Sequence, residues 1–188
     1  MTTNYSRLTI GKFLITFGEK QNECKYLISL NDERVNKGIC PSKVEAIKTV
    51  EDFISTYKKN MLSKRVDGIP TPQEFAEALS SVKPSDAQWE MLKAHYHAPN
   101  KKLTSSQLAE AAGFQHFYAA NTQYGTLGGL IARHLGITPP GKYKDGKPLW
   151  ITTITLENSK SIESDTGHYQ HILRNEVAEA LEIVGGTI

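Results

Sequence analysis

Residues 103–136 constrain the fold of this chain most, because they contain two helical patterns separated by a glycine. In the first pattern, Leu108 and Ala112 lie on one face and Gly113 ends the run. The second pattern starts near residue 118 and ends at Gly136, where a left-handed helix end is favourable. Its apolar stripe consists of Leu127, Leu130, Ile131 and Leu135. Two helices joined by a short turn can present the second helix to a nucleic-acid groove.

The opposite face of the second helix is nearly bare. Asn121, Gly125 and Gly129 recur every four residues, with Gly128 beside them. A glycine inside a helix costs roughly 1 kcal/mol of stability relative to alanine. The glycines are therefore expected to allow another group to approach the helix backbone closely. Either a neighbouring helix packs tightly against it, or a phosphate backbone does, and the sequence leaves both interpretations open.

The side chains around the glycines favour the second interpretation. Amides such as those of Asn121 and Gln123 can bond adenine with two hydrogen bonds, and the hydroxyl of Tyr124 can reach a phosphate. Residues 118–124, which begin with Tyr118, are therefore expected to enter or border a groove. His116, in the turn before the helix, either contacts a phosphate or base or lies half-buried with its aromatic neighbours.

The charge of the chain is segregated along the sequence. Residues 100–150 contain six basic and two acidic side chains, whereas residues 151–188 contain two basic and six acidic ones. The basic residues of the first segment are Lys101, Lys102, Arg133, Lys142, Lys144 and Lys147. Because this basic segment coincides with the two helices, it would orient an approaching polyanion, although a charged run is also typical of a solvated surface.

Composition indicates an ordinary globular protein, since 39% of the 188 residues are hydrophobic and 22% are charged. No apolar run approaches the length of a membrane span and the first residues lack a signal sequence, so we expect a cytoplasmic protein without membrane contacts. Cys24 and Cys40 have neither zinc-site nor disulfide-framework spacing. We expect reduced thiols that are at least partly buried.

The first third of the chain predicts a small α+β domain, residues 1–66. Segments 7–17 and 25–30 alternate between apolar and polar residues and read as a hairpin around the polar turn 18–23. Ser42, with Glu45 three residues later, has the spacing of a capping box, and an amphipathic pattern follows to Tyr57. Residues 58–72 read as a polar linker.

Residues 67–188 predict a mainly helical domain, which makes the whole chain α+β. Thr71 opens a helix to about residue 79, Ser85 caps another one, and Thr104 or Ser105 caps the first of the helical pair. The threonines and isoleucines of residues 149–156 favour a strand, which would form a second hairpin with residues 169–173. A short helix over 176–184 ends the chain. Three helices followed by a hairpin is the order of a winged helix.

The stretches GIPTPQEFAEAL, LKAHYHAP, LTSSQLAEAAGF and AANTQYGTLGGLIARHLG resemble, as a set, a bacterial winged-helix-like module of restriction-type proteins. The resemblance covers about residues 69–185, and such modules are sometimes found next to an HNH nuclease domain. It implies association with DNA, in defence against foreign DNA, and implies no role for any single residue. The chain departs from the nuclease-linked arrangement because it has no histidine, asparagine and histidine set at the usual spacing, so a nuclease would have to be another chain.

Nothing in the sequence favours catalysis, a metal or a cofactor. His95 and His97, and likewise His168 and His171, are spaced so that each pair points to opposite faces, which disfavours joint metal binding. Glycine-rich phosphate loops and nucleophile elbows are missing. We expect surface or partly buried histidines, and we expect the two tryptophans to be core anchors.

The sequence therefore predicts a two-domain, non-catalytic protein that binds double-stranded DNA as a reader or regulator, with a nuclease chain or another protein as a further partner. Lys101, Lys102 and Arg133 would neutralise phosphates. The loop before the predicted wing would flank the groove with Lys142, Lys144 and Lys147. The alternative is a protein-interaction module, such as a phage-encoded or plasmid-encoded inhibitor, in which the glycine edge receives a helix of the partner.

Overall fold

The chain is α+β and separates into two compact units, Met1–Ile69 and Pro70–Ile188. The computed structural model describes residues 3–30, 32–156 and 170–185. The division lies three residues beyond the end of the first predicted domain. Within the described ranges, no helix is both long and apolar enough to cross a membrane.

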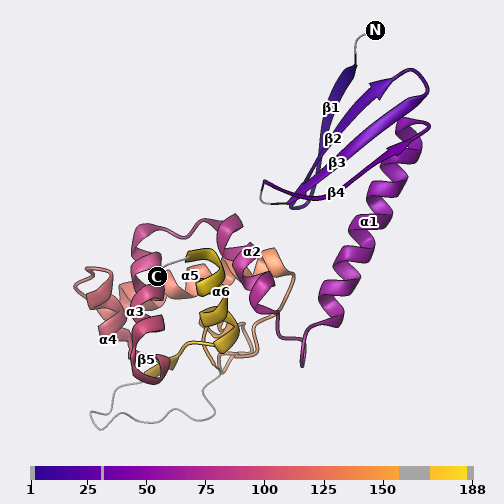
Figure 1. The fold of residues 1–188 in the computed structure, drawn as a ribbon. Helices are drawn as coiled ribbons and strands as arrows, with labels where there is room; N and C mark the ends of the chain where they lie inside the picture. Colours follow the sequence, from indigo (N-terminus) through magenta and orange to yellow (C-terminus); the bar gives the residue numbers. More distant parts are fainter. Residues whose placement is uncertain (1–2, 31, 157–169, 186–188) are drawn as a thin grey trace. The chain divides into compact units, whose positions relative to one another are not determined.

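The first unit is a four-stranded antiparallel sheet with one helix packed along one of its faces (Figure 1). The strands follow one another in sequence order as β1 (Asn4–Ile10), β2 (Phe13–Lys20), β3 (Glu23–Leu30) and β4 (Glu33–Cys40). The helix α1 (Lys43–Ser63) follows directly, with the Ser42 hydroxyl accepting a hydrogen bond from the Glu45 amide, as the capping spacing predicted.

Two strand predictions for this unit were wrong. Residues 7–17 form two strands instead of one, because Gly11 adopts a positive φ of 58° and turns the chain between β1 and β2. The strand β4 was missed, since its sequence ERVNKGIC is largely polar and shows no clear alternation. The helix also continues six residues beyond Tyr57, into the predicted linker.

The core of the first unit lies between the sheet and α1. Alternate residues of the central strands are buried on the side that α1 covers: Phe13, Ile15 and Phe17 from β2, and Cys24, Ile28 and Leu30 from β3. From α1, Ala46, Val50 and Ile54 recur every four residues and are buried against them. The alternation thus assigns one face of the sheet to the core and leaves the other face to solvent.

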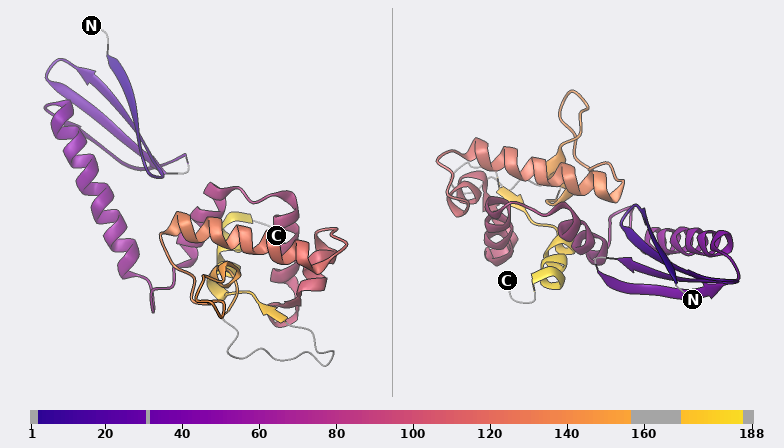
Figure 2. Two further views of the ribbon diagram at one scale, coloured as in Figure 1. Left: turned by 180° about the vertical axis from the view of Figure 1, so that it is seen from behind. Right: turned by 90° about the horizontal axis from the view of Figure 1, so that it is seen from above.

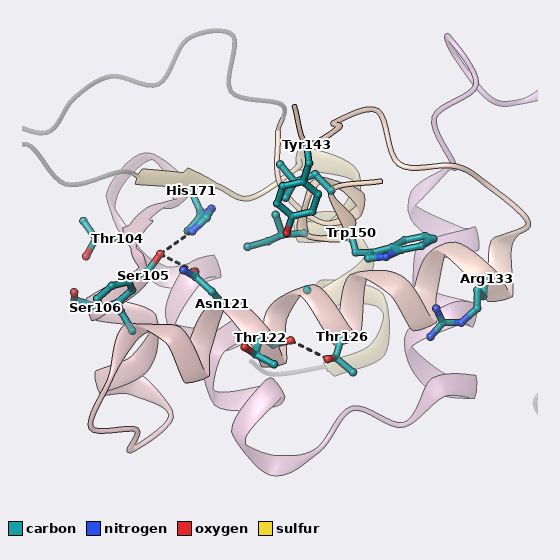
Figure 3. A pocket seen from close by; sticks show the side chains of 14 residues that line it. Thr104, Ser105, Ser106, Asn121, Thr122, Thr126, Arg133, Tyr143, Trp150 and His171 are labelled. Atoms are coloured by element: carbon teal, nitrogen blue, oxygen red, sulfur yellow. Dashed lines mark hydrogen bonds between the residues drawn. The ribbon is translucent and has the colours of Figure 1, made fainter. Parts of the chain in front are cut away.

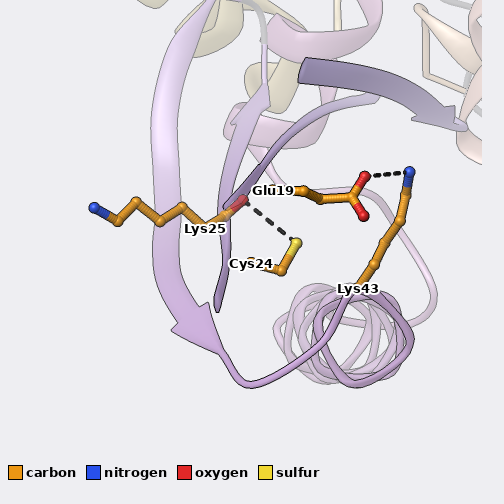
Figure 4. A network of polar contacts seen from close by, with 4 residues as sticks. All are labelled: Glu19, Cys24, Lys25 and Lys43. Atoms are coloured by element: carbon orange, nitrogen blue, oxygen red, sulfur yellow. Dashed lines mark hydrogen bonds and ion pairs between the residues drawn. The ribbon is translucent and has the colours of Figure 1, made fainter. Parts of the chain in front are cut away.

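Polar contacts fasten the start of α1 to this face. Lys43 Nζ lies 2.8 Å from Glu19 Oε1, which joins the end of β2 to the first turn of the helix (Figure 4). Cys24 and Cys40 are opposite each other in the β3–β4 pair. Both thiols are free, and Cys24 is buried while Cys40 is half-buried, which confirms the expectation from the sequence.

The described part of the second unit is mainly helical. Its α-helices are α2 (Pro72–Val82), α3 (Asp86–His97), α4 (Ser105–Ala111), α5 (Phe117–Leu135) and α6 (Asn175–Gly185). The short elements between them are the 3-10 helices η1 (Pro99–Lys101) and η2 (Trp150–Thr153) and the paired strands β5 (Lys102–Thr104) and β6 (Gln170–Ile172). The longest of these helices, α5, packs against α2, α3, α4 and η2 (Figure 2).

Local capping explains where these helices begin and end. Thr71, Ser85 and Thr104 each accept a hydrogen bond from the amide three residues later, and the side chain at that position bonds back. Gly136 ends α5 in the left-handed conformation, with φ of 62°. The helix boundaries predicted from these signals are confirmed within a few residues.

The strand predicted over residues 149–156 was wrong, because residues 150–153 form the 3-10 helix η2. The Thr152 hydroxyl donates to Leu149 O at 2.7 Å, and the Thr155 hydroxyl donates to Ile151 O at 3.0 Å. Such local bonds compete with a strand. An isolated bridge between Thr155 and Leu173 joins the two segments of the predicted hairpin, and the strand β6 pairs with β5. The predicted tip, 158–167, lies outside the described residues.

The glycine edge of α5 is divided between packing and open space. Gly128 and Gly129 are buried, and a Cβ atom on Gly128 would collide with the backbone carbonyl of Trp150. Gly129 faces the Trp150 ring, whereas a Cβ on Gly125 would meet nothing within 4 Å. Tight packing therefore accounts for two of the glycines, and only Gly125 leaves a bare stretch of helix.

These two environments predict opposite effects of the same substitution. Gly128→Ala should lower the free energy of unfolding by about 1–3 kcal/mol, because the backbone of η2 must move. Gly125→Ala is the matched control and should raise it by up to about 1 kcal/mol, the gain in helix propensity. Urea unfolding followed by tryptophan fluorescence measures both, since Trp89 and Trp150 lie in the second unit. Equal effects of the two substitutions would contradict the assigned packing.

Candidate functional site

A pocket of about 830 Å³ lies beside α5 in the second unit (Figure 3). Its walls are the start of α4, the outer edge of α5, the segment leading to η2, η2 itself and β6. The lining residues are Thr104, Ser105, Ser106, Phe117, Asn121, Thr122, Gly125, Thr126, Arg133, Tyr143, Leu149, Trp150, Ile151 and His171. A cavity of this volume is in the range that accommodates small molecules or a single base.

The helical wall of the pocket is made of short side chains. Asn121, Thr122, Gly125 and Thr126 cover more than one turn of α5. The Thr126 hydroxyl donates to Thr122 O at 2.8 Å, and the Thr122 hydroxyl donates in the same way to a carbonyl four residues back. Both hydroxyls therefore keep acceptor capacity toward the pocket. The open space at Gly125 brings the helix surface itself into the wall.

One end of the pocket is polar. Ser105 Oγ donates to Asn121 Oδ1 at 2.7 Å and lies 3.0 Å from His171 Nε2. Because the single hydroxyl proton goes to Asn121, the Ser105 oxygen accepts the proton of His171 Nε2. Burial, with a smaller contribution from nearby His95, lowers the pKa of His171 to about 4. His171 is therefore neutral at physiological pH. It fixes the position of Ser105, which in turn fixes the side chain of Asn121.

The other end of the pocket is aromatic and positively charged. The Arg133 guanidinium carbon lies 5.8 Å from the centre of the Trp150 ring, which is half-buried and lines the wall. Tyr143, 57% exposed, lines the same cavity from the segment before η2. This end offers flat rings for stacking and a fixed positive charge for an anionic group.

A buried hydrogen-bond chain supports the pocket from behind α5. His95 Nε2 lies 3.0 Å from the backbone oxygen of His171, and His95 Nδ1 lies 3.0 Å from the Tyr124 hydroxyl. A carbonyl only accepts, so Nε2 carries the proton and Nδ1 accepts from Tyr124. Burial lowers the pKa of His95 to about 4 and raises that of Tyr124. These hydrogen bonds join α3, α5 and β6, and so help to set the position of His171.

Two predicted nucleic-acid contacts are corrected by this arrangement. Tyr124 is fully buried, with 0% of its surface exposed, and its hydroxyl bonds His95, so it cannot reach a phosphate. Gln123 is half-buried, and its side-chain and backbone oxygens both lie 3.2 Å from Gln88 Nε2 on α3. At 3.6 residues per turn, position 123 lies roughly 200° around the helix from Asn121, whereas position 124 lies only roughly 60° away on the other flank, where Tyr124 points into the core.

Of the other predicted contacts, Asn121 and Arg133 line the pocket. Three lysines lie exposed in the segment that carries Tyr143: Lys142, Lys144 and Lys147. Lys147 pairs with Asp145 at 2.7 Å.

The remaining predicted contacts lie outside the pocket lining. Lys101 and Lys102 are half-buried where η1 meets β5, and Lys101 Nζ lies 5.6 Å from the centre of the Tyr96 ring. His116 is exposed at the residue before α5, so its alternative as part of a half-buried aromatic cluster does not hold. Tyr118 is 71% exposed and its ring stacks on Phe117 with centres 4.1 Å apart. Of the nucleic-acid contacts predicted from the sequence, the structure thus brings only Asn121 and Arg133 together in the pocket lining.

Sequence reasoning missed Ser105, Tyr143 and His171 as site residues and treated Trp150 as a core anchor. The structure brings them together because β6 pairs with β5 and η2 packs on α5. The only local signal was the hydroxyl-rich start of α4, which was interpreted as capping. His95 and His171 are both buried, so the expectation of surface or partly buried histidines was wrong for these two. No group of three or more metal-ligating side chains occurs in the described ranges.

Comparison with known proteins gave no match to any protein-family model, curated protein or solved structure. The side chains of the pocket and the charges around it are therefore what indicates a function for this chain.

The buried histidines predict a pH-dependent stability of the second unit. The pKa values of His95 and His171 are about 4, below the ordinary value of 6.5 expected in the unfolded chain. Between these pH values the unfolded state binds more protons than the folded state does. The contribution of the two histidines to the free energy of unfolding is therefore complete above pH 6.5 and falls as the pH drops toward 4. Each pKa unit corresponds to about 1.4 kcal/mol, so we expect a combined loss of several kcal/mol.

Urea unfolding at a series of pH values, followed by tryptophan fluorescence, measures this loss. The range from about pH 6.5 to 5 is the informative one, because most carboxylates titrate below it. His97→Gln is the matched control, since His97 is exposed and two residues from His95. It should leave the profile unchanged. A flat wild-type profile in this range would contradict the buried neutral state of both histidines.

Proposed function

We propose that residues 70–188 form a non-catalytic module that binds double-stranded DNA along the exposed edge of α5 and accepts one everted base in the pocket. The observation that supports this most is the combination of groups that line one cavity. Trp150 supplies a stacking ring, Asn121 an amide, and Arg133 a guanidinium. A base needs a π-face contact, hydrogen bonds at its edge and a positive charge for its phosphate.

The shape of the pocket is the reason for proposing a single everted base. A base pair inside a duplex is stacked on both sides and presents only its groove edges, whereas a released base exposes its whole face and edge. The amide of Asn121 can pair with the edge of adenine, and neighbouring Thr122 and Thr126 oxygens can accept from exocyclic amino groups. Stacking of a base on an aromatic side chain contributes about 1–3 kcal/mol, which offsets part of the cost of eversion.

The charges beside the pocket suit a duplex on the same face. Arg133 lies in the wall, and Lys142 and Lys144 are exposed on either side of Tyr143. These three cations would contact phosphates next to the everted nucleotide. Lys101 and Lys102 precede α4, where they would contact the backbone further along. Phosphate contacts of this kind provide affinity without sequence preference.

The order of elements also supports a winged-helix-like arrangement. The strand β5 precedes the α4–α5 pair and pairs with β6, which follows it. A role as a reader or regulator in defence against foreign DNA, with a nuclease supplied by another chain, follows from the resemblance of residues 69–185 alone.

A second candidate function is a protein-interaction module. It is favoured by the stacked rings of Phe117 and Tyr118, which are 43% and 71% exposed at the start of α5. Exposed aromatic rings are enriched at protein interfaces. In this case the chain would form a stable complex or dimer in light scattering, and added DNA would not change it.

Base eversion is tested with a duplex that contains one 2-aminopurine, whose fluorescence rises when it leaves the stack. The wild-type chain should raise the fluorescence. Asn121→Ala should retain binding but lose discrimination between bases by roughly 1–3 kcal/mol, because the edge contact is removed. Gln115→Ala, an exposed amide outside the pocket lining, is the matched control and should behave as wild type. Tight binding without any rise in fluorescence would exclude the everted base.

The phosphate contacts are tested separately by a mobility-shift titration at two salt concentrations. Lys101→Ala should weaken binding to all sequences alike and reduce the slope of log affinity against log salt by about 1. A chain that fails to bind any duplex even at low salt would rule out the DNA-binding function and leave the interaction module.

A further inference from the structure

The face of the N-terminal sheet that points away from α1 is strongly basic. Successive residues of a strand point to opposite faces, and the side that carries Phe13, Ile15 and Phe17 is buried under α1. The residues between them therefore point to the open face. Figure 4 shows this for β3, where Lys25 extends away from α1 while Cys24 lies on the helix side.

The register of the four strands places five cations on this open face. They are Arg7, Lys20, Lys25, Arg34 and Lys37, and all five are exposed. Within β1–β4, which the structure describes completely, the open face carries one carboxylate, Glu23, which pairs with Lys25 at 3.3 Å. The other strand carboxylates, Glu19 and Glu33, are in register with the helix side. The sheet thus separates its charges by face.

Three of the five cations, Arg7, Arg34 and Lys37, lie on the edge strands β1 and β4, and Lys20 and Lys25 lie on the central strands near the turn between β2 and β3. One cross-strand row runs from Arg7 on β1 through Thr16 and Leu27 to Lys37 on β4. Three strand spacings separate its ends by about 14 Å, which is close to the 12 Å width of the DNA major groove. Cations at both ends would meet phosphates on the two sides of the groove, with a hydroxyl and an apolar side chain facing the base edges between them.

We propose that this open face is a second DNA-binding surface, which contacts a duplex across its major groove. It lies in the first unit and does not depend on the pocket proposed as a base-binding site. A duplex suits it better than a single strand, because proteins that bind single strands stack bases on aromatic rings. The single aromatic residue among the open-face positions of β1–β4 is Tyr5, which lies over Gly18 at one edge.

The test uses the full chain and a labelled duplex of mixed sequence, with affinity measured by fluorescence anisotropy over a range of salt concentrations. Arg7→Gln with Lys37→Gln removes the two ends of the row. We expect the slope of log affinity against log salt to fall by about 2, since each phosphate contact contributes about 0.9. Circular dichroism checks that the sheet is intact.

The matched control is Lys48→Gln with Lys58→Gln, which removes the same charge from exposed positions on α1. An unchanged slope in the control supports a local contact at the sheet. A control that loses as much as the sheet variant overturns the proposal, and so does a sheet variant with the wild-type slope. Tighter binding of a single strand than of the duplex, lost with the same two substitutions, also overturns it.

The same sheet substitutions are repeated in the Asn121→Ala chain, and the slope should fall by the same amount. The two proposals are therefore judged by different readouts. Loss of the fluorescence rise concerns the pocket alone, and loss of salt dependence with Arg7 and Lys37 concerns the sheet alone.

Discussion

The second unit depends on the close approach of α5 to the backbone of η2 at Gly128. A helix normally keeps its neighbours away by the length of its side chains, but here the carbonyl of Trp150 occupies the space that a Cβ would need. This contact brings the Trp150 ring beside Gly129 and Arg133 and closes one wall of the pocket. One turn earlier, Gly125 has no such neighbour, and the pocket opens there.

Buried polar groups then give the pocket its fixed geometry. Tyr124 and His95 are satisfied by each other and by the backbone oxygen of His171, so the core contains a directed chain of hydrogen bonds in place of apolar contacts. Such a network is stable only when every member has its partner. It therefore specifies where β6 lies, and with it the histidine that holds Ser105 and Asn121. The same burial keeps both histidines neutral.

The two units carry different surfaces for what we propose to be the same polymer. The second unit offers a pocket with a ring, an amide and a guanidinium, which suits recognition of one nucleotide. The first unit offers a sheet face with five cations, three of them on its edge strands, which suits phosphates. If one DNA molecule contacts both, binding of one unit raises the local concentration of DNA at the other, and moderate affinities combine into a larger one. A chain of only +2 net charge can bind a polyanion in this way because its cations are gathered on particular faces.

The sequence by itself determined the α+β class and where the capped helices begin, although α1 continues six residues beyond its predicted end. These depend on hydrogen bonds and alternation between residues a few positions apart, such as the caps at Thr71 and Ser85. Only the tertiary structure decided which side of α5 meets solvent, and so buried Tyr124 and left open space beside the half-buried Gly125. It also decided that residues 150–153 form a 3-10 helix and that His171 joins Ser105. The reason is physical: burial and pairing depend on partners far away in the chain, and no local pattern encodes which partner arrives.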